Sequence, residues 1–172
     1  GAISLLWSTI QPTSPQVDSI KPPFEGTNKA WVDSVMKVLT PDQRIGQLFM
    51  VAAYSNKPKS HQDEITKLIK DYPIGGLIFM QGGPVRQAKL CNYYQQISNV
   101  PLMISIDGEW GLAMRLDSTE AFPKQMTLGA IQNDSLIYLM GKEIARQCRR
   151  MGIQVNFAPV VDVNNNASNP VI

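Results

Sequence analysis

Short apolar runs alternate with amphipathic segments along most of this chain, and this alternation restricts its fold more than any other feature. The apolar runs predict buried strands, and they lie at residues 48–53, 74–80, 101–107 and 153–158. The amphipathic segments predict helices, and they lie at residues 28–39, 61–71, 84–98 and 133–151. This alternation predicts an α/β fold with a parallel sheet, because a parallel neighbour is reached only by a crossover connection.

A further helix start is encoded just before the first strand. Thr40 is a favoured N-cap, Pro41 occupies the tolerated first helical position, and Gln43 stands three residues after the cap. This spacing is that of a capping box. It predicts a short helix that leads directly into the first strand.

Two architectures fit this pattern: an open doubly wound sheet and a (β/α)8 barrel. A barrel requires eight strand–helix units and about 250 residues, whereas this 172-residue chain supplies four predicted strands. We therefore expect residues 28–172 to form the N-terminal half of a TIM (β/α)8 barrel, truncated after about the fourth strand. The rival is a complete, non-catalytic flavodoxin-like module that binds a ligand or partner. A half barrel exposes an unpaired edge strand and an apolar concave face, so we expect it to self-associate.

Composition narrows the class of partner. Hydrophobic residues make up 44% of the chain and charged residues 17%, as in globular domains, and no apolar run approaches the roughly 20 residues of a membrane span. The net charge is +2 and the basic residues are scattered, so nucleic acid is not an expected partner.

Cys91 and Cys148 fall inside predicted helices and are expected to be packing residues. No metal cluster, Ser-His-Asp set or phosphate loop can be assembled, so we predict neither metal nor cofactor.

Residues 1–27 are predicted to be a leader or linker ahead of the domain. An apolar stretch at residues 2–7 precedes a segment rich in Pro, Ser and Thr. The stretch fits either the remnant of a signal peptide or a leader that packs on the surface, and the sequence does not separate the two. The first interpretation predicts a periplasmic or extracellular protein.

The polar residues that follow the third strand form the candidate site. In parallel α/β folds, groups at the carboxyl ends of the strands face a common crevice, and here they include Asp107, Trp110 and Arg115. An ionised carboxylate accepts hydrogen bonds from two vicinal hydroxyls, and an aromatic ring suits the apolar face of a sugar. Asp107 is therefore a candidate sugar-binding residue, with Trp110 and Arg115 at the pocket rim. The alternative for Asp107 is a helix cap or a loop brace.

Two acidic residues are predicted to support this site. Glu109 shares one short loop with Asp107, so the two do not suit the paired carboxylates of a glycosidase, and Glu109 is expected to brace the loop or to pair with Arg115. Asp162 follows the fourth strand and either holds a neighbouring cation or forms an Asx-turn with Asn164. His61, the only histidine, is expected at the surface without local partners.

Four segments carry a more specific signal. They read LTPDQRIGQL at residues 39–48, IGGLIF at 74–79, PLMISIDGEWGLAMR at 101–115 and GIQVNFAPVVDVN at 152–164. In this order they resemble the N-terminal barrel domain of family 3 glycoside hydrolases, of the β-N-acetylglucosaminidase and β-glucosidase kind. One departure is Trp110, which stands where the family usually has a glycine.

The resemblance implies a retaining β-glycosidase that acts on carbohydrate at a non-reducing end, in cell-wall recycling or glycan breakdown. It implies that Asp107 binds hydroxyls of the sugar in the cleavage subsite. It also implies an aspartate nucleophile on a later strand and an acid/base from a histidine loop or a second domain. It further implies a Lys-His pair that binds sugar and an arginine after the Asn-Pro segment. None of these residues has a counterpart in this sequence. We therefore expect no catalytic residue in this chain and no cleavage by it alone.

Overall fold

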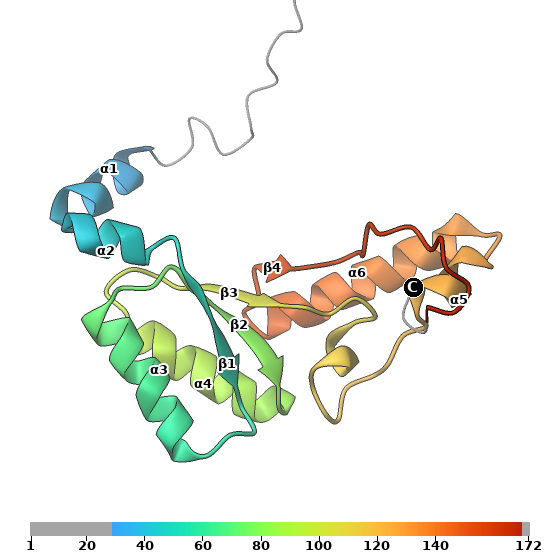
Figure 1. The fold of residues 1–172 in the computed structure, drawn as a ribbon, viewed down its shortest axis with the longest axis horizontal. Coiled ribbons are helices and arrows are strands. Elements are labelled where there is room, and N and C mark those ends of the chain that lie inside the picture. Colours follow the sequence, from blue (N-terminus) through green and yellow to red (C-terminus); the bar gives the residue numbers. More distant parts are fainter. Residues whose placement is uncertain (1–28, 170–172) are drawn as a thin grey trace, which may run out of the picture.

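A computed structural model describes residues 29–169, so the predicted leader at residues 1–27 lies outside the described residues. Its centre is a four-stranded sheet in the order β1-β2-β3-β4 (Figure 1), and every neighbouring pair is parallel. The strands are β1 (Met50–Tyr54), β2 (Gly76–Gln81), β3 (Met103–Ile106) and β4 (Val155–Asn156). The predicted α/β fold is confirmed.

The strand order separates the two architectures that the sequence allowed. A flavodoxin-like sheet has the order 2-1-3-4-5, in which the chain reverses direction across the sheet. Here every strand lies beside its neighbours in sequence, as in the wall of a (β/α)8 barrel. The described strands therefore form a half barrel, and the flavodoxin-like alternative is wrong in its topology.

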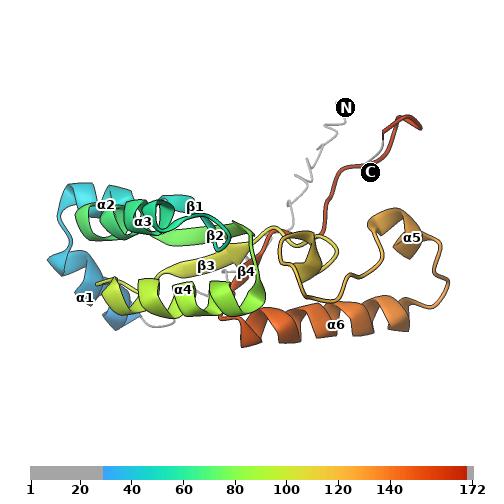
Figure 2. The ribbon, with the colours of Figure 1, turned by 90° about the horizontal axis from the view of Figure 1, so that it is seen from below.

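Helices connect the strands and precede the sheet. Between strands run α3 (Lys59–Asp71), α4 (Pro84–Ile97) and α6 (Asp134–Arg150), and α1 (Lys29–Val38) and α2 (Pro41–Gly46) come first. α6 extends well past the sheet, and its first turns lie toward the same end of the molecule as α5 (Gln125–Gly129) in both ribbon views (Figures 1 and 2). None of the described helices is both long enough and apolar enough to cross a bilayer.

The predicted helix start at Thr40 is confirmed in detail. Thr40 Oγ1 accepts a hydrogen bond from the Gln43 N–H at 3.3 Å, and the Thr40 N–H donates to Gln43 Oε1 at 3.0 Å. These reciprocal bonds satisfy donors that a helix start otherwise leaves free. The short helix α2 then delivers the chain to β1.

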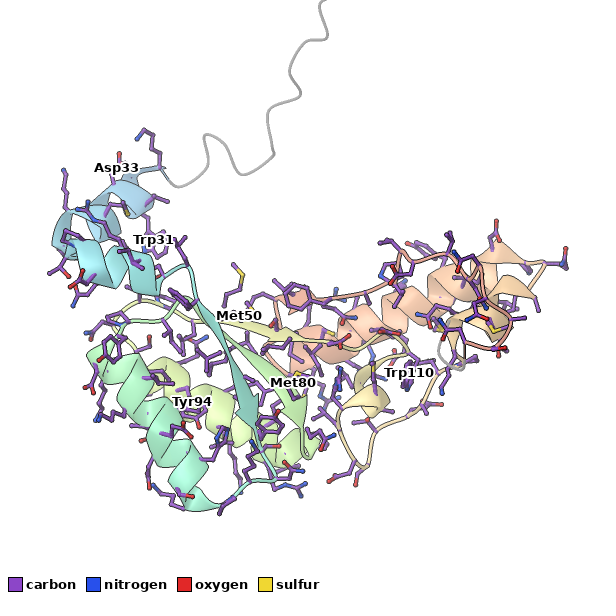
Figure 3. The ribbon with its side chains drawn as sticks, in the orientation of Figure 1. Trp31, Asp33, Met50, Met80, Tyr94 and Trp110 are labelled. Carbon is purple, nitrogen blue, oxygen red and sulfur yellow. The ribbon has the colours of Figure 1, made fainter. Side chains whose placement is uncertain are left out.

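Alternate residues of the strands pack against α3 and α4. Leu77 and Phe79 of β2 and Ile104 and Ile106 of β3 are buried in one cluster with residues of both helices, including Tyr94. Met50 lies on the opposite face and points away from these helices (Figure 3). The side chains that alternate along β2 and β3 thus turn one face of the sheet toward the helical layer.

Both cysteines are packing residues, as predicted. Cys91 and Cys148 are free, buried and part of the core cluster. Burial raises the pKa of the Cys91 thiol to about 12 and also raises the pKa of Cys148. Such thiols are unreactive at neutral pH, because the thiolate is the nucleophile.

His61 corrects the prediction of a surface histidine without partners. Its side chain is only 12% exposed, its ring meets the Tyr54 ring edge-on with centroids 5.4 Å apart, and Nδ1 lies 3.7 Å from a Glu64 carboxylate oxygen. The prediction is wrong because α3 begins two residues earlier than expected, at Lys59. His61 is therefore inside the first turn and faces the end of β1.

The outer edges of the sheet carry exposed apolar side chains. Leu48, just before β1, is 84% exposed, and Phe157, just after β4, is 52% exposed. Among the described residues, β1 pairs only with β2 and β4 only with β3. Unpaired edges flanked by apolar side chains are what a half barrel should present.

Candidate functional site

The carboxyl end of β3 presents an ion pair between Asp107 and Arg115. Arg115 Nη2 donates to the Asp107 carboxylate, and Arg115 Nε donates to the Asp107 backbone carbonyl at 2.9 Å. The Asp107 and Arg115 side chains are 28% and 17% exposed, so the pair is partly desolvated. Arg115 binds only Oδ2 of the carboxylate, and within residues 29–169 no hydrogen bond to Oδ1 is formed. The structure thus brings together two of the predicted site residues.

A tight turn returns Arg115 to Asp107. Gly111 has φ of 88°, in the left-handed region that favours glycine, and a Cβ there would lie 2.7 Å from the Phe122 ring. The 3-10 turn η1 (Leu112–Met114) follows, and the Arg115 N–H donates to the Leu112 carbonyl at 3.0 Å. The position of the arginine therefore depends on a glycine at 111.

Glu109 does not pair with Arg115, so that part of its prediction is wrong. The arginine is already bound by Asp107. The Glu109 backbone carbonyl accepts a hydrogen bond from Gln125 Nε2 at 3.1 Å. The Glu109 backbone N–H donates to Met114 Sδ at 3.4 Å. Glu109 thus connects the loop to α5 through its backbone.

Asn156 at the end of β4 is a part of the site that the sequence interpretation missed. Its side-chain Oδ1 accepts from the Gly108 N–H at 2.9 Å, and its Nδ2 donates to the Gly108 carbonyl at 3.2 Å. These bonds hold the backbone immediately after Asp107. The available signal was a polar side chain within an apolar strand, next in the sheet to β3.

Trp110 lies on the loop between β3 and η1 (Figure 3), and its side chain is partly exposed. Lys124 Nζ lies 5.0 Å from the centre of the Trp110 ring system, and the Trp110 carbonyl accepts from the Phe122 N–H at 3.3 Å. Such a cation over an aromatic face is favourable. Trp110 is thus three residues after Asp107 in the sequence, and the Lys124 ammonium lies beside its ring.

Asp162 lies apart from these contacts. It is exposed in the segment after β4, and within residues 29–169 no hydrogen bond or ion pair joins it to Asp107 or Arg115. The nearby turn is made by Asn164, whose Oδ1 accepts from the Asn166 N–H at 3.0 Å. The supporting role of Asp162 stays a prediction.

A cavity of about 550 Å³ adjoins the ion pair without including it. Gly108, Glu109, Gln125 and Asn156 contribute to its lining, together with several apolar residues of α6. Asp107, Trp110 and Arg115 are not among its lining residues. Because a sugar needs polar partners for its hydroxyls, the ion pair is the stronger candidate for the contact.

The segment that follows Arg115 joins the ends of β3 and β2. Gly82 donates its N–H to the Arg115 carbonyl at 3.2 Å and accepts from the Asp117 N–H at 2.8 Å. Asp117 also forms an ion pair at 2.6 Å with Arg86 in the first turn of α4, and this hydrogen bond lowers the pKa of Asp117. No group of residues suited to hold a metal ion occurs in the described part of the chain.

The comparison with protein families gives one match over most of the chain. The model described as "Glycosyl hydrolase family 3 N terminal domain" matches residues 40–172. The chain is 32% identical over 160 residues to β-hexosaminidase A of Pseudoalteromonas piscicida, which covers 78% of this chain and 27% of that protein. It is 27% identical over 142 residues to the β-N-acetylglucosaminidase/β-glucosidase of Cellulomonas fimi, with coverages of 83% and 24%. The chain thus spans about a quarter of the length of these relatives.

Solved structures share the fold. The β-glucoside phosphorylase BglX bound to 2FGlc aligns with a TM-score of 0.76 at 20% identity, over 86% of this chain and 27% of that chain. NagZ from Neisseria gonorrhoeae, in complex with N-trifluoroacetyl-D-glucosamine, aligns with a TM-score of 0.51 at 19% identity, over 67% of this chain and 37% of that chain. These likenesses support the half-barrel assignment.

Proposed function

The chain belongs to glycoside hydrolase family 3, and from this premise we propose that it is part of a retaining β-glycosidase that hydrolyses O-glycosyl bonds of β-linked N-acetylglucosamine or glucose. The observation that carries the proposal is Asp107, which lies at the carboxyl end of β3 with one carboxylate oxygen held by Arg115. The relatives named β-hexosaminidase and β-N-acetylglucosaminidase/β-glucosidase support this choice of sugar.

Asp107 binds the sugar in this proposal, and its neighbours position it. Oδ1 accepts hydrogen bonds from vicinal hydroxyls, while the Arg115 guanidinium holds Oδ2 and fixes the orientation of the carboxylate. Trp110 contributes an aromatic surface at the rim of the pocket. Glu109 and Asp162 support the site without contacting the sugar.

In this proposal, the residues that carry out the cleavage step lie outside residues 28–172. Retaining hydrolysis requires a nucleophile and an acid/base roughly 5–5.5 Å apart on either side of the bond that is cleaved. Asp107 is engaged by Arg115, and Glu109 is the only other carboxylate on the loop. We therefore propose that residues 28–172 are a partial barrel domain that binds sugar but does not cleave it alone.

Two further parts of the proposal concern compartment and assembly. A periplasmic or extracellular location fits the apolar stretch near the N-terminus and the 24% identity to the periplasmic β-glucosidase of Salmonella typhimurium.

Self-association through the open sheet edges fits the exposure of the apolar side chains of Leu48 and Phe157 beside those edges. Light scattering on the purified chain distinguishes a monomer from a larger assembly.

The test measures binding and turnover by protein of verified 172-residue mass. N-acetylglucosamine and methyl β-glucoside are titrated while tryptophan fluorescence is recorded, in wild type, Asp107→Asn and the control Asp162→Asn. Asp107→Asn should weaken binding by about tenfold or more, as expected when a hydrogen bond to a charged group is lost, and Asp162→Asn should change it little. Equal affinity in all three proteins would refute the role of Asp107.

Turnover is followed with p-nitrophenyl β-N-acetylglucosaminide and β-glucoside. No turnover is expected from the chain alone. Turnover that disappears in Glu109→Gln would instead place the chemistry on the loop after β3.

A further inference from the structure

We infer that a basic pocket beside the candidate site binds the anionic group of an acidic glycan, either a carboxylate or a phosphate. This inference rests on the proposed function and specifies its substrate class. It concerns the carboxyl ends of β1 and β2, where α3 and α4 begin.

The basic pocket is a cavity of about 460 Å³ between the first turns of these two helices. Four basic side chains line it: Lys57, Lys59, Arg86 and Lys89. Its remaining lining residues are Tyr54, Ser55, Gln62, Leu90 and Tyr93, so no carboxylate lies among them. Four like charges around one cavity repel one another and attract a negatively charged ligand.

Only two of the four basic side chains form ion pairs among the described residues. Asp63 pairs with Lys59, and Asp117 pairs with Arg86. Lys57 Nζ lies 3.6 Å from the centre of the Tyr54 ring, which leaves its charge unneutralised. In the described part of the chain, no ion pair involves Lys57 or Lys89. These two lysines are therefore the ones available to an anion.

The other walls of the basic pocket suit a sugar rather than a bare ion. Tyr54 and Tyr93 place two aromatic rings in the lining, and Gln62 adds an amide. Aromatic rings pack on the apolar faces of sugars, and amides hydrogen-bond hydroxyls. Ser55 is already committed, because its Oγ accepts from the Gly83 N–H at 3.1 Å. The combination favours an acidic sugar over free phosphate.

A continuous set of backbone and side-chain contacts connects the basic pocket to Asp107. Arg86 of the pocket pairs with Asp117, two residues beyond the Arg115 that binds Asp107. The same segment hydrogen-bonds Gly82, which precedes α4. The pocket and the ion pair thus lie at the same end of the sheet, the end at which functional groups of parallel α/β folds gather.

The test compares an acidic sugar, a phosphorylated sugar, a neutral sugar and a bare anion as probes. Glucuronic acid, glucose 6-phosphate, methyl β-glucoside and inorganic phosphate are titrated into the 172-residue chain at low and at moderate ionic strength, with amide chemical shifts recorded by NMR. Both acidic sugars should shift amides of residues 54–62 and 84–93, more strongly than inorganic phosphate does. The stronger of the two identifies the source of the anionic group.

Variants assign the binding to the pocket. Lys57→Gln combined with Lys89→Gln should weaken the acidic sugars by about tenfold or more, whereas the control Lys70→Gln, at the exposed end of α3, should leave the affinity unchanged. Because Lys57 and Lys89 have no ion-pair partner among the described residues, their removal strands no carboxylate and should preserve folding. Gln62→Glu places a negative charge in the same cavity and should weaken binding without removing any lysine.

The outcomes separate this inference from the proposed function. If the neutral sugar binds in an Asp107-dependent manner but acidic and neutral sugars bind with equal affinity, the basic pocket is refuted and the proposed function stands. If acidic sugars bind through Lys57 and Lys89 while the neutral sugar does not bind, the assignment of Asp107 fails instead. Equal weakening by Lys70→Gln would show that the effect is only one of net charge.

Discussion

The side-chain amide of Asn156 forms two hydrogen bonds with the backbone of Gly108, accepting from its N–H at 2.9 Å and donating to its carbonyl at 3.2 Å. Gly108 is buried and directly follows Asp107. A residue at the end of β4 thereby fixes the backbone at the end of β3. The candidate site therefore depends on two strands that are far apart in the sequence.

Asn156→Ala should lower the free energy of unfolding by about 1–3 kcal/mol, because it leaves the buried Gly108 N–H without an acceptor. Chemical denaturation measures the change. The control is Asn92→Ala on the exposed side of α4, where the effect should be within about 0.5 kcal/mol. Equal effects of the two substitutions would mean that the Gly108 bonds contribute nothing.

Gln87 and Gln95 on α4 should respond differently to replacement by leucine. Gln87 is fully buried, and neither of its amide atoms has a hydrogen-bond partner among the described residues. Gln95 binds both backbone groups of Leu102, at 2.7 and 2.9 Å. Gln87→Leu should leave the free energy of unfolding unchanged or raise it, and Gln95→Leu should lower it by about 1–3 kcal/mol. Destabilisation by Gln87→Leu would reveal a partner for that amide.

Gly111→Ala should destabilise the chain by about 1–3 kcal/mol, because residue 111 has a positive φ and a Cβ would collide with Phe122. Gly141→Ala, in the interior of α6 with no atom beyond its chain neighbours and its own helix backbone within 4 Å of the added Cβ, should instead stabilise by about 0.5–1 kcal/mol. Thermal unfolding of the two variants gives the comparison. A tolerated alanine at 111 would contradict the structure of the turn that positions Arg115.

The ion pair between Glu143 and Arg146 should make stability depend on pH in acid. Hydrogen bonds from Arg146 lower the pKa of Glu143 from 4.5 to about 2. A depressed carboxylate pKa stabilises the folded state above the ordinary value, and this contribution is lost as the pH falls through the folded-state value. The difference in Tm between wild type and Glu143→Gln should be constant above about pH 4.5 and should vanish near pH 2. It should be small, because the pair is exposed, and a difference that grew in acid would contradict the assignment.

Most of the fold could be predicted because the apolar periodicity changes sharply along the chain. The four predicted strands and the helices α3, α4 and α6 all occur, with ends that differ by a few residues. The helix α5 and the turn η1 were missed because each is too short to show a helical repeat. β4 is only two residues long, shorter than its apolar run, since pairing with β3 ends where Asn156 turns to bind Gly108.

The sequence placed Asp107 and Arg115 in the candidate site, but it did not predict their pairing and it missed Asn156. The rule that polar groups gather at strand ends identified Asp107 and Arg115. Which acidic residue binds Arg115 depends on the positive φ of Gly111 and on η1, and neither can be deduced from spacing alone. The contact between Asn156 and Gly108 joins different strands, so no local pattern reveals it.

The order of the strands also bears on how the chain is made. Each of the described strands after β1 lies beside the one synthesised just before it, so it finds that partner already present when it leaves the ribosome. The longest interval separates β3 from β4 and contains Arg115, η1, α5 and α6. The loop at Asp107 therefore exists before Asn156 has been synthesised, and it acquires its final shape only when the fourth strand arrives.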